Sequence, residues 1–375
     1  MFRPQIQKTS TLFFIALFNV CMVYIAVNSQ TKIEKVGYQD KIHASNKMEK
    51  MILELDENFE FEKSELDIYN TGLFGTDNSS ITTIQDYDSL MVRSKLLTTH
   101  PSFAAIIVEF FYDAEIEHGD TIAVSMTGSF PGANIALLSA CEAMGVIPIS
   151  ISSAGSSSWG ANREVFSWPT IESFLYDKKL IKRKSIGYSM GGDNDNGDNL
   201  PDSGIELLES IIPDNVVFVN RLNLFDNIDE KIELFRKSCT DYSMYVNIGG
   251  GASSLGPGND KDTLQVGLLN VLDMEDLEFD GFESSIAYQF LKTESIPMLN
   301  IKNITKLVSD SYKKEFFKGD MQIDKGSLFY KYDSYNPIVI LLCLFLSVAL
   351  ITSIGVFSHL QIKRRMETHE VDSII

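Results

Sequence analysis

Cysteine and histidine are both scarce, with four cysteines and five histidines among 375 residues. Cys21 and Cys343 fall within long apolar runs and Cys141 within a helical apolar pattern, so Cys239 is the only cysteine expected near a surface. No cysteine spacing fits a zinc site, and a disulfide between Cys141 and Cys239 cannot be read from the sequence. We therefore predict no zinc site and no cofactor.

Basic residues are also few, since 32 Lys and Arg face 51 Asp and Glu, a formal charge of −19. With the five basic and three acidic residues of the two chain tails set aside, 27 basic and 48 acidic residues remain, a charge of −21. Such a charge argues against nucleic acid as a partner and against attachment to anionic lipid. Its simplest role is solubility at a crowded surface.

Two long apolar runs lie near the chain ends. Leu12–Val27 and Ile338–Phe357 contain no charged residue, and about 20 apolar residues suffice to cross a bilayer. The first run also fits a cleaved signal peptide, but its cleavage pattern is poor, so an uncleaved anchor is favoured. The predicted segments are an N-terminal tail at 1–11, transmembrane helices at 12–28 and 337–357, and a basic C-terminal tail at 358–375.

The charges beside these runs favour one orientation. Lys363, Arg364 and Arg365 stand together after the second run, whereas basic residues around the first run are nearly evenly divided. Because Lys and Arg next to a span favour the cytoplasmic side, we predict a two-span protein of the cell membrane with both termini in the cytoplasm. The enclosed domain is then extracytoplasmic.

Residues 29–99 are predicted to form an amphipathic stalk followed by a polar cap segment. Met48, Met51, Ile52 and Leu55 recur at helical spacing. From residue 69 to 99 the chain is rich in Gly, Thr and Ser, as in a covering loop.

Between residues 100 and 335, short β-branched runs alternate with helical patterns. This alternation predicts a soluble α/β domain with a doubly wound, mostly parallel sheet covered on both faces. The expected strands lie at 121–127, 146–151, 184–190, 216–219, 244–248 and 297–301. The expected helices lie at 103–116, 131–144, 170–180, 203–212, 228–238, 263–277 and 303–317.

Ligands of such sheets bind beyond the carboxyl ends of the strands. Three loops rich in Gly and Ser follow predicted strands, at 128–134, 152–163 and 246–256. The first loop equally fits a plain strand-to-helix turn, and the third equally fits close packing against a neighbouring loop. The candidate ligand-binding residues are Ser129, Asn134, Ser156, Ser157, Trp159, Asn162, Arg163, Gly249, Gly250 and Gly251.

The loop at 152–163 favours binding over catalysis. Both tryptophans of the chain, Trp159 and Trp168, lie in or beside it, and a solvated loop seldom contains tryptophan. A serine nucleophile there lacks the G-x-S-x-G elbow and an obvious His base.

A fourth loop at 191–199 offers oxygen ligands of the kind that calcium binds, chiefly Asp193 and Asp195. Counted from Asp193, it has Asp198 where an EF-hand needs Gly and Gly204 where it needs Glu. A solvated acidic turn is therefore the default interpretation, and no metal site is predicted.

An ordered set of motifs spans about residues 70–260. The motifs are Thr71-Gly72-Leu73-Phe74-Gly75, Ile81-Thr82-Thr83, His100-Pro101-Ser102-Phe103-Ala104-Ala105, the loop at 128–134, Ser152 to Asn162 with Trp159-Gly160-Ala161-Asn162, Gly191-Gly192, and Val246-Asn247-Ile248-Gly249-Gly250-Gly251. Taken in order, this set resembles the poly-γ-glutamate system protein family. Members are membrane-anchored companions of poly-γ-glutamate synthase, and the resemblance supplies no catalytic residues.

The resemblance implies an accessory membrane protein of poly-γ-glutamate synthesis or export, whose partners are the membrane components of the synthase. A domain of charge −21 repels a polyanion unless a cation bridges them or a local pocket is positive, and only Arg163 offers a nearby charge among the candidates. Scaffolding of the synthase is thus preferred over handling of the emerging polymer. The alternatives are an extracytoplasmic hydrolase or transferase using the Ser-rich loop, and, in the opposite orientation, a cytoplasmic nucleotide-binding domain.

Overall fold

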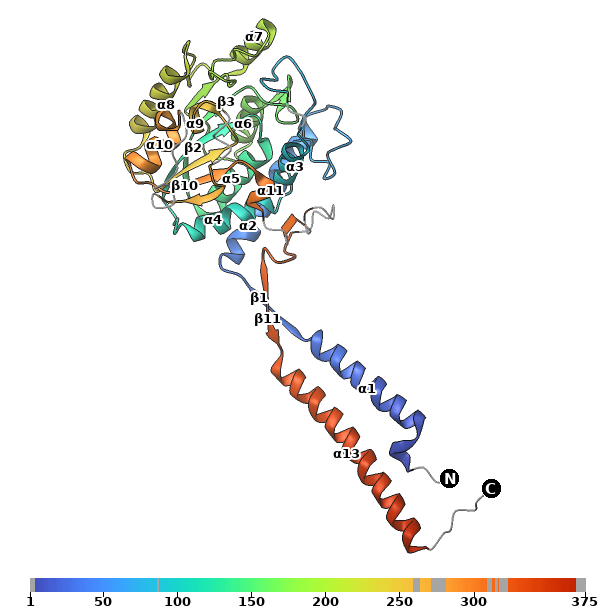
Figure 1. Ribbon diagram of the computed structural model, residues 1–375. Coiled ribbons are helices and arrows are strands. Elements are labelled where there is room, and N and C mark those ends of the chain that lie inside the picture. The colour runs from blue at the N-terminus through green and yellow to red at the C-terminus, as the bar shows by residue number, and fades with distance from the viewer. Residues whose placement is uncertain are drawn as a thin grey trace. The chain divides into compact units, whose positions relative to one another are not determined.

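The computed structural model divides the chain into two compact units (Figure 1). The first consists of Met1–Glu34 with Tyr330–Ile375, and the second of Lys35–Phe329. The residues that the structure describes are 4–85, 88–258, 264–270, 281–308, 312–313, 316 and 323–368.

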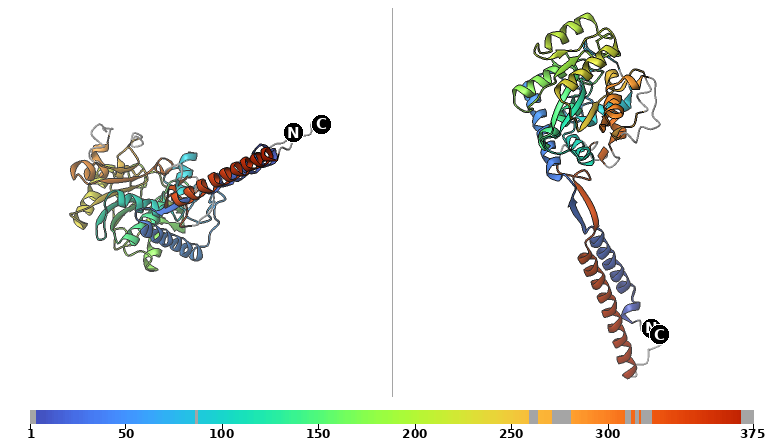
Figure 2. Two further views of the ribbon diagram at one scale, coloured as in Figure 1. Left: turned by 90° about the horizontal axis from the view of Figure 1, so that it is seen from below. Right: turned by 90° about the vertical axis from the view of Figure 1, so that its left-hand side faces the viewer.

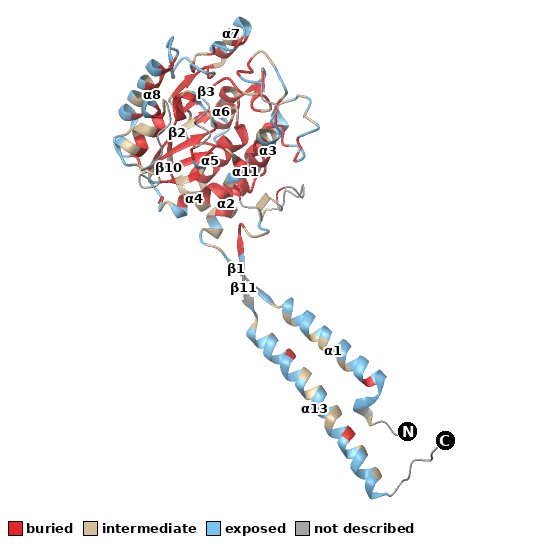
Figure 3. Cartoon of the chain, in the orientation of Figure 1, coloured by how far each residue is buried: buried red, intermediate tan, exposed pale blue. Residues whose placement is uncertain are grey.

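The first unit joins the two ends of the chain. Helix α1 (Thr9–Val27) packs beside α13 (Pro337–Glu367), as both views in Figure 2 show. Strands β1 (Gln30–Glu34) and β11 (Tyr330–Tyr335) pair antiparallel. Both helices are long and apolar enough to cross a membrane, and most of their residues are exposed (Figure 3). The sequence predicted these helices, but it gave no sign of the strand pair.

The second unit contains a seven-stranded sheet in the order β7-β6-β3-β2-β8-β10-β9. Every neighbouring pair is parallel except β10 with β9, which confirms the predicted mostly parallel α/β sheet. After β2 the chain adds β3, β6 and β7 on one side of that strand. It then places β8 on the other side of β2, with β10 and β9 beyond it. The strands are β2 (Thr121–Thr127), β3 (Ile147–Ser153), β6 (Gly187–Ser189), β7 (Val217–Phe218), β8 (Met244–Ile248), β9 (Gly267–Leu269) and β10 (Met298–Ile301).

Helices cover both faces of this sheet (Figure 1). Odd-numbered residues of β3 such as Ile149 and Ile151 belong to a core cluster with α8, α9 and α10. The even-numbered Ser152 points the other way, because side chains alternate along a strand, and it accepts a hydrogen bond from Trp168 of α6 at 3.1 Å. The helices are α2 (Tyr38–Asn58), α3 (Ser89–Thr98), α4 (Phe103–Asp113), α5 (Pro131–Met144), α6 (Trp168–Asp177), α7 (Asp202–Ile211), α8 (Leu224–Ser238), α9 (Ala252–Leu255), α10 (Ile286–Tyr288) and α11 (Ile304–Leu307).

The structure differs from the stalk interpretation of residues 29–99. The helical pattern is real, but α2 packs against α4 and α5 as part of the α/β unit, with Met48, Met51, Ile52 and Leu55 buried. The amphipathic face of α2 therefore belongs to the core of this unit. The polar segment that follows contains helix α3, which was not predicted.

Two predicted helices also differ from the structure. The helix expected at 263–277 contains strand β9, while residues 263 and 271–277 lie outside the described part of the chain. Of the helix expected at 303–317, the structure describes α11 and a few residues beyond it. A short apolar run fits a strand as well as a helix, and here pairing with β10 decides the outcome.

Helix α6 carries a buried carboxylate, that of Glu172. Glu172 accepts hydrogen bonds from the Ser185 backbone at 3.1 Å, the Ser185 hydroxyl at 2.8 Å and the Tyr188 hydroxyl. Burial raises the pKa of Glu172, although these hydrogen bonds oppose the shift. The native state therefore holds this proton more tightly than the unfolded chain does.

Glu172→Gln is expected to remove one part of the pH dependence of stability. A raised native pKa makes the unfolding free energy fall as pH rises from about 4.5, the ordinary value, through the raised value. Glutamine keeps the acceptor oxygen and cannot ionise, so the variant lacks that fall. Denaturant midpoints measured between acid and neutral pH test this, with Glu57→Gln on the exposed side of α2 as the control that keeps the wild-type profile. Identical profiles for wild type and Glu172→Gln contradict it.

Candidate functional site

The strand order changes direction between β2 and β8, which is the place where open α/β sheets bind ligands. A cavity of about 330 Å³ lies beyond the carboxyl ends of these strands. This volume is within the range of small-molecule sites. All four loops singled out in the sequence contribute to its wall, together with Thr83 and Ile84 of the polar cap segment and Lys231 and Lys302.

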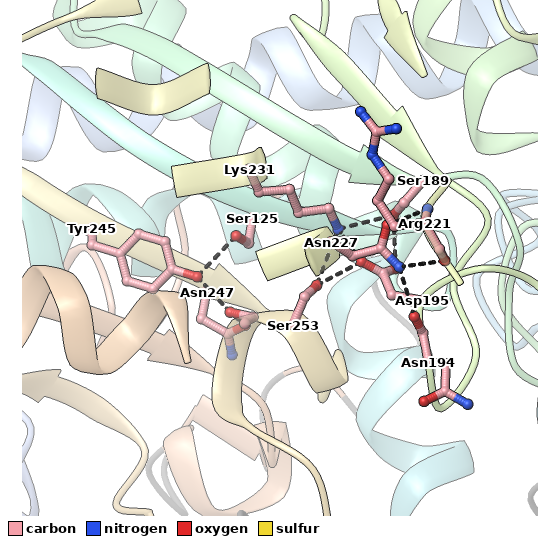
Figure 4. A network of polar contacts seen from close by, with 11 residues as sticks. Ser125, Ser189, Asn194, Asp195, Arg221, Asn227, Lys231, Tyr245, Asn247 and Ser253 are labelled. Carbon is pink, nitrogen blue, oxygen red and sulfur yellow. Dashed lines mark hydrogen bonds and ion pairs between the residues drawn. The ribbon is translucent and has the colours of Figure 1, made fainter. Parts of the chain in front are cut away.

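A buried ion pair forms part of the wall (Figure 4). The Lys231 ammonium from α8 binds the Asp195 carboxylate and donates to the hydroxyls of Ser189 at 2.9 Å and Ser253 at 3.0 Å. Those two hydroxyls in turn donate to Asp195 at 2.7 and 2.8 Å. Lys231 and Asp195 are only 5% and 4% exposed, so each charge depends on the other for compensation.

A second polar network joins cavity-lining side chains of β2, β8 and α9. The Tyr245 hydroxyl contacts Ser125 at 2.8 Å and Ser254, and Ser254 donates to the Asn247 side chain at 2.5 Å. Asn247 donates to the carbonyl of Gly249 at 2.7 Å. These bonds fix the glycine-rich turn to the strand that precedes it.

Lys302 supplies another positive charge to the cavity. It directly follows β10 and is 6% exposed. A methyl group built on Gly250 would lie 3.3 Å from Cε and 3.8 Å from Nζ of Lys302, so the lysine extends against the backbone of the glycine loop. Lys231 is paired with Asp195, and Lys302 adds a second buried lysine to this wall.

The Ser-rich loop meets a third lysine. Lys95 of α3 donates to the Ser157 hydroxyl at 2.7 Å and to the carbonyl of Ser158. Ser157 lines the cavity, and its backbone N–H donates to the Ser129 hydroxyl at 2.9 Å. The first two loops are thereby joined at the cavity wall.

The ten candidate residues divide into two groups. Ser129, Ser157, Gly250 and Gly251 line the cavity, as do the weak metal candidates Asp193 and Asp195. The residues outside the lining are Asn134, Ser156, Trp159, Asn162, Arg163 and Gly249.

Several of the second group hold the polar cap segment in place. The Asn162 side chain accepts from the backbone of Thr76 at 2.9 Å and donates to its carbonyl at 2.8 Å. The Arg163 guanidinium donates to the carbonyls of Gly72 at 3.1 Å and Glu62 at 3.3 Å. The Trp159 ring stacks on the Phe74 ring, with the ring centroids 5.4 Å apart. Their contacts are therefore made with the protein's own chain.

The remaining three candidates also make internal contacts. The Asn134 amide donates to the carbonyl of Thr127 at 2.9 Å, and the fully buried Ser156 hydroxyl donates to the carbonyl of Ser157 at 2.9 Å. Gly249 packs against Thr127 at the end of β2.

The aspartates of the fourth loop show no metal-site geometry. Asp195 is occupied by the Lys231 ammonium, and Asp193 is exposed at the cavity wall. Among the residues that the structure describes, no group of three or more His, Cys, Asp or Glu side chains converges as metal ligands would.

Sequence reasoning missed all three lysines. Lys302 carried a usable signal, because it directly follows a predicted strand on the ligand-binding edge. Lys231 lies within a helical pattern, where an isolated lysine indicates a solvated face. Lys95 lies in the segment predicted as a polar covering loop, where a lysine carries no signal of a site.

Gly249→Ala is expected to destabilise the protein by about 2 kcal/mol, while Gly251→Ala changes stability by less than about 0.5 kcal/mol. Gly249 has φ +89°, and an added methyl group would lie 2.4 Å from Cγ2 of Thr127. Gly251 has φ −56°, and nothing lies within 4 Å of such a group. Denaturant unfolding followed by tryptophan fluorescence compares the two. Equal losses of stability in the two variants would show that the turn does not require glycine at position 249.

The cavity thus combines hydroxyls, glycine backbone, a compensated ion pair and Lys302 at the switch point of the sheet. This wall suits a small polar ligand with a carboxylate or similar anion. No family model, no curated protein and no solved structure matches this chain.

Proposed function

We propose that this chain is a membrane-anchored accessory protein of poly-γ-glutamate synthesis and export, and that its α/β unit handles the polymer by binding a γ-glutamyl carboxylate. The observation that carries the proposal is the cavity at the β2–β8 switch point with Lys302 in its wall. The pathway is proposed from the resemblance of the ordered motifs between residues 71 and 251 to the poly-γ-glutamate system protein family.

The lysine answers the electrostatic objection to polymer binding. A strongly acidic domain repels a polyanion over its whole surface, unless a local pocket is positive. Lys302 provides that local charge in a wall largely shielded from water, where its attraction for a carboxylate is screened less than at the surface. Polymer handling is therefore favoured over scaffolding alone.

The two apolar helices support membrane attachment at both ends of the chain. In the proposed arrangement α1 and α13 both cross the cell membrane, with the termini in the cytoplasm. The hydrogen bond from the Ile6 backbone to the Ser358 hydroxyl at 2.8 Å brings the two chain ends together at one end of this helix pair. An α/β unit outside the membrane would meet the polymer as it emerges from the synthase.

Two measurements test the proposal. Isothermal titration of the full-length protein in detergent is expected to detect binding of γ-linked glutamyl tetramers and weaker binding of α-linked tetramers of the same charge. Deletion of the gene is expected to change polymer yield, length or location. Absence of γ-glutamyl binding would contradict the proposed ligand. An unchanged polymer in the deletion strain would contradict the proposed role in the pathway.

A second candidate function is hydrolysis or transfer at a γ-glutamyl amide, favoured by the contact between Lys95 and Ser157. A lysine amine beside a serine hydroxyl is the arrangement of Ser–Lys hydrolases. Once deprotonated, the amine takes the hydroxyl proton as serine Oγ bonds to the amide carbon. The leaving amine receives that proton, and water or another amine then releases the acyl group.

Ser157→Ala is expected to abolish cleavage of γ-glutamyl oligomers if this second function holds, because no other hydroxyl in the Ser-rich loop combines cavity access with a lysine partner. Ser156→Ala is the matched control, since Ser156 is fully buried and outside the lining. Chromatography of oligomers after incubation provides the measurement. Equal cleavage by both variants would reject Ser157 as the nucleophile.

A further inference from the structure

A second cavity of about 420 Å³ lies beside the start of α8. It shares Asp193 and Ala252 with the wall of the first cavity, and its volume is within the range of small-molecule sites. Among the residues that the structure describes, its lining is Asp193, Asn194, Asn223, Leu224, Phe225, Ala252, Pro257 and Gly258, and it includes no basic side chain.

Hydrogen bonds of two asparagines hold this wall in place before any ligand arrives. The fully buried Asn227 accepts from the backbone of Arg221 at 2.7 Å and donates to the carbonyl of Asn194 at 2.9 Å (Figure 4). Asn196 donates to the carbonyl of Leu222 at 3.2 Å. The loop after β6 and the start of α8 are thereby fixed to each other. A preformed wall lowers the entropic cost of binding.

The polar groups of this wall offer chiefly acceptors. The Asn223 amide donates to the Asp226 carboxylate at 2.6 Å, and the Asn194 amide donates to the Asp198 carboxylate at 2.9 Å. Each amide nitrogen therefore already has an acceptor within the chain. Among the described residues, no donor reaches Oδ1 of Asn194 or Oδ1 of Asp193, whose other oxygen accepts at 3.4 Å. A ligand that donates hydrogen bonds matches these free acceptors.

The charge around the cavity is negative. Asp193 and Asp226 are exposed, whereas Arg221 of the same turn is paired with Glu230 at 2.8 Å. Asp226 lies in the first turn of α8, where its carboxylate offsets the positive end of the helix dipole. An anionic ligand would face these carboxylates, and the described lining has no cation to compensate them. A positively charged ligand is therefore favoured.

Phe225 adds an aromatic ring to this acidic wall. The residue is 52% exposed although it is large and apolar. The face of an aromatic ring attracts a cation placed over it. A guanidinium group is planar, weakly hydrated and stacks on aromatic faces, whereas an ammonium group is strongly hydrated and loses more on leaving water. The half-exposed ring therefore suits a guanidinium better than an ammonium.

We infer that the second cavity binds a guanidinium group on an aliphatic stem, either a free alkylguanidine or an arginine side chain of a partner protein. The cation stacks on Phe225 and donates to the Asp193 carboxylate and the side-chain oxygen of Asn194. The stem packs on Ala252 and Pro257, the small apolar residues of the opposite loop. This site is independent of the ligand proposed for the first cavity.

Ligand-observed NMR titration of the full-length protein in nonionic detergent, at about 0.15 M salt, tests this with n-butylguanidinium and its uncharged isostere n-butylurea. The guanidinium is expected to bind about tenfold more tightly than the urea, and n-pentylammonium is expected to bind more weakly than the guanidinium. Phe225→Ala and Asp193→Asn are each expected to weaken guanidinium binding about fivefold. Both residues are exposed, so the unfolding midpoints of these variants should stay close to that of the wild type.

Two matched controls lie beside the site. Leu222→Ala truncates an apolar residue that is 94% exposed and lines neither cavity. Asp229→Asn removes an exposed carboxylate of α8 outside both linings. Both variants should bind n-butylguanidinium as the wild type does, because neither changes a group that contacts the ligand.

The peptide Ac-Gly-Arg-Gly-NH2 and its citrulline counterpart distinguish the two sources of the guanidinium. Tighter binding of the arginine peptide than of n-butylguanidinium indicates a partner protein, and equal or weaker binding indicates a free alkylguanidine. Equal affinity for n-butylguanidinium and n-butylurea would overturn the site, as would unchanged guanidinium binding in folded Phe225→Ala protein. Calcium binding that depends on Asp193, is unaffected by Phe225→Ala and displaces the guanidinium would replace it with a metal site.

Discussion

Lys231→Met is expected to lower the unfolding free energy of the protein by about 3–5 kcal/mol. Asp195 is 4% exposed in the structure, and the substitution leaves its carboxylate with the Ser189 and Ser253 hydroxyls as its side-chain partners among the described residues. A buried charge without a counter-charge keeps its full desolvation cost, and that cost exceeds what two hydroxyl hydrogen bonds return. Unfolding of the full-length protein in detergent is followed by tryptophan fluorescence, because Trp159 and Trp168 both belong to the α/β unit.

Two further variants isolate the cause. Arg221→Met removes the same formal charge from a solvent-exposed pair with Glu230, so the unfolding midpoint should stay close to that of the wild type. Asp195→Asn in the Lys231→Met background removes the uncompensated carboxylate and should restore part of the lost stability. A Lys231→Met midpoint equal to the wild type would contradict the expectation. A further loss in the double variant would show that Asp195 itself, and not its unpaired charge, is what matters.

The centre of the sheet could be predicted from the sequence alone. The predicted bounds of β2, β8 and α5 agree with the structure, because a β-branched run between Gly-containing turns leaves little choice of element. The outer parts are harder to predict. β9 pairs antiparallel with β10, and β1 pairs with β11 from the opposite end of the chain. Such pairing depends on partners far away in the sequence, which no local pattern encodes.

The candidate site was predicted as an edge of the sheet but not as a set of side chains. Ser129, Ser157, Gly250 and Gly251 follow from the rule that ligands bind beyond the strand ends. Trp159 was predicted as a ligand-binding residue because a solvated loop seldom contains tryptophan, and Asn162 because it lies in the same polar loop. Their partners, Phe74 and Thr76, lie about 85 residues earlier in the chain. The sequence therefore could not show whether Trp159 and Asn162 bind a ligand or hold another segment of the chain.

The contact between residues 71–75 and residues 159–162 explains why glycine is needed at position 75. A methyl group on Gly75 would lie 1.9 Å from the carbonyl of Gly160 and 2.3 Å from Oδ1 of Asn162. The first motif therefore needs glycine where it touches the Trp159-Gly160-Ala161-Asn162 motif. The clamped segment continues to Thr83 and Ile84 in the cavity wall, so the two motifs shape the site without lining it.

Lys302→Met is expected to weaken binding of γ-glutamyl tetramers at least about 30-fold, since truncating one partner of a buried charge pair costs at least about 2 kcal/mol. Methionine keeps an unbranched chain against Gly250 and removes only the ammonium. Lys306→Met is the matched control, because Lys306 carries the same charge four residues later on an exposed turn of α11. Titration calorimetry and unfolding are measured on both variants.

The salt dependence of binding separates a local contact from general attraction. If Lys302 binds the carboxylate directly, the affinity of the wild type should fall with added salt and that of Lys302→Met should change less, while Lys306→Met should follow the wild type. Equal losses of affinity in Lys302→Met and Lys306→Met would mean that both lysines act only through the overall electrostatic field of the domain. Unchanged affinity in a folded Lys302→Met protein would remove the cation on which carboxylate recognition depends. Because the domain as a whole is acidic, its overall field would then repel the polymer, and binding would require a bridging cation or another positive pocket.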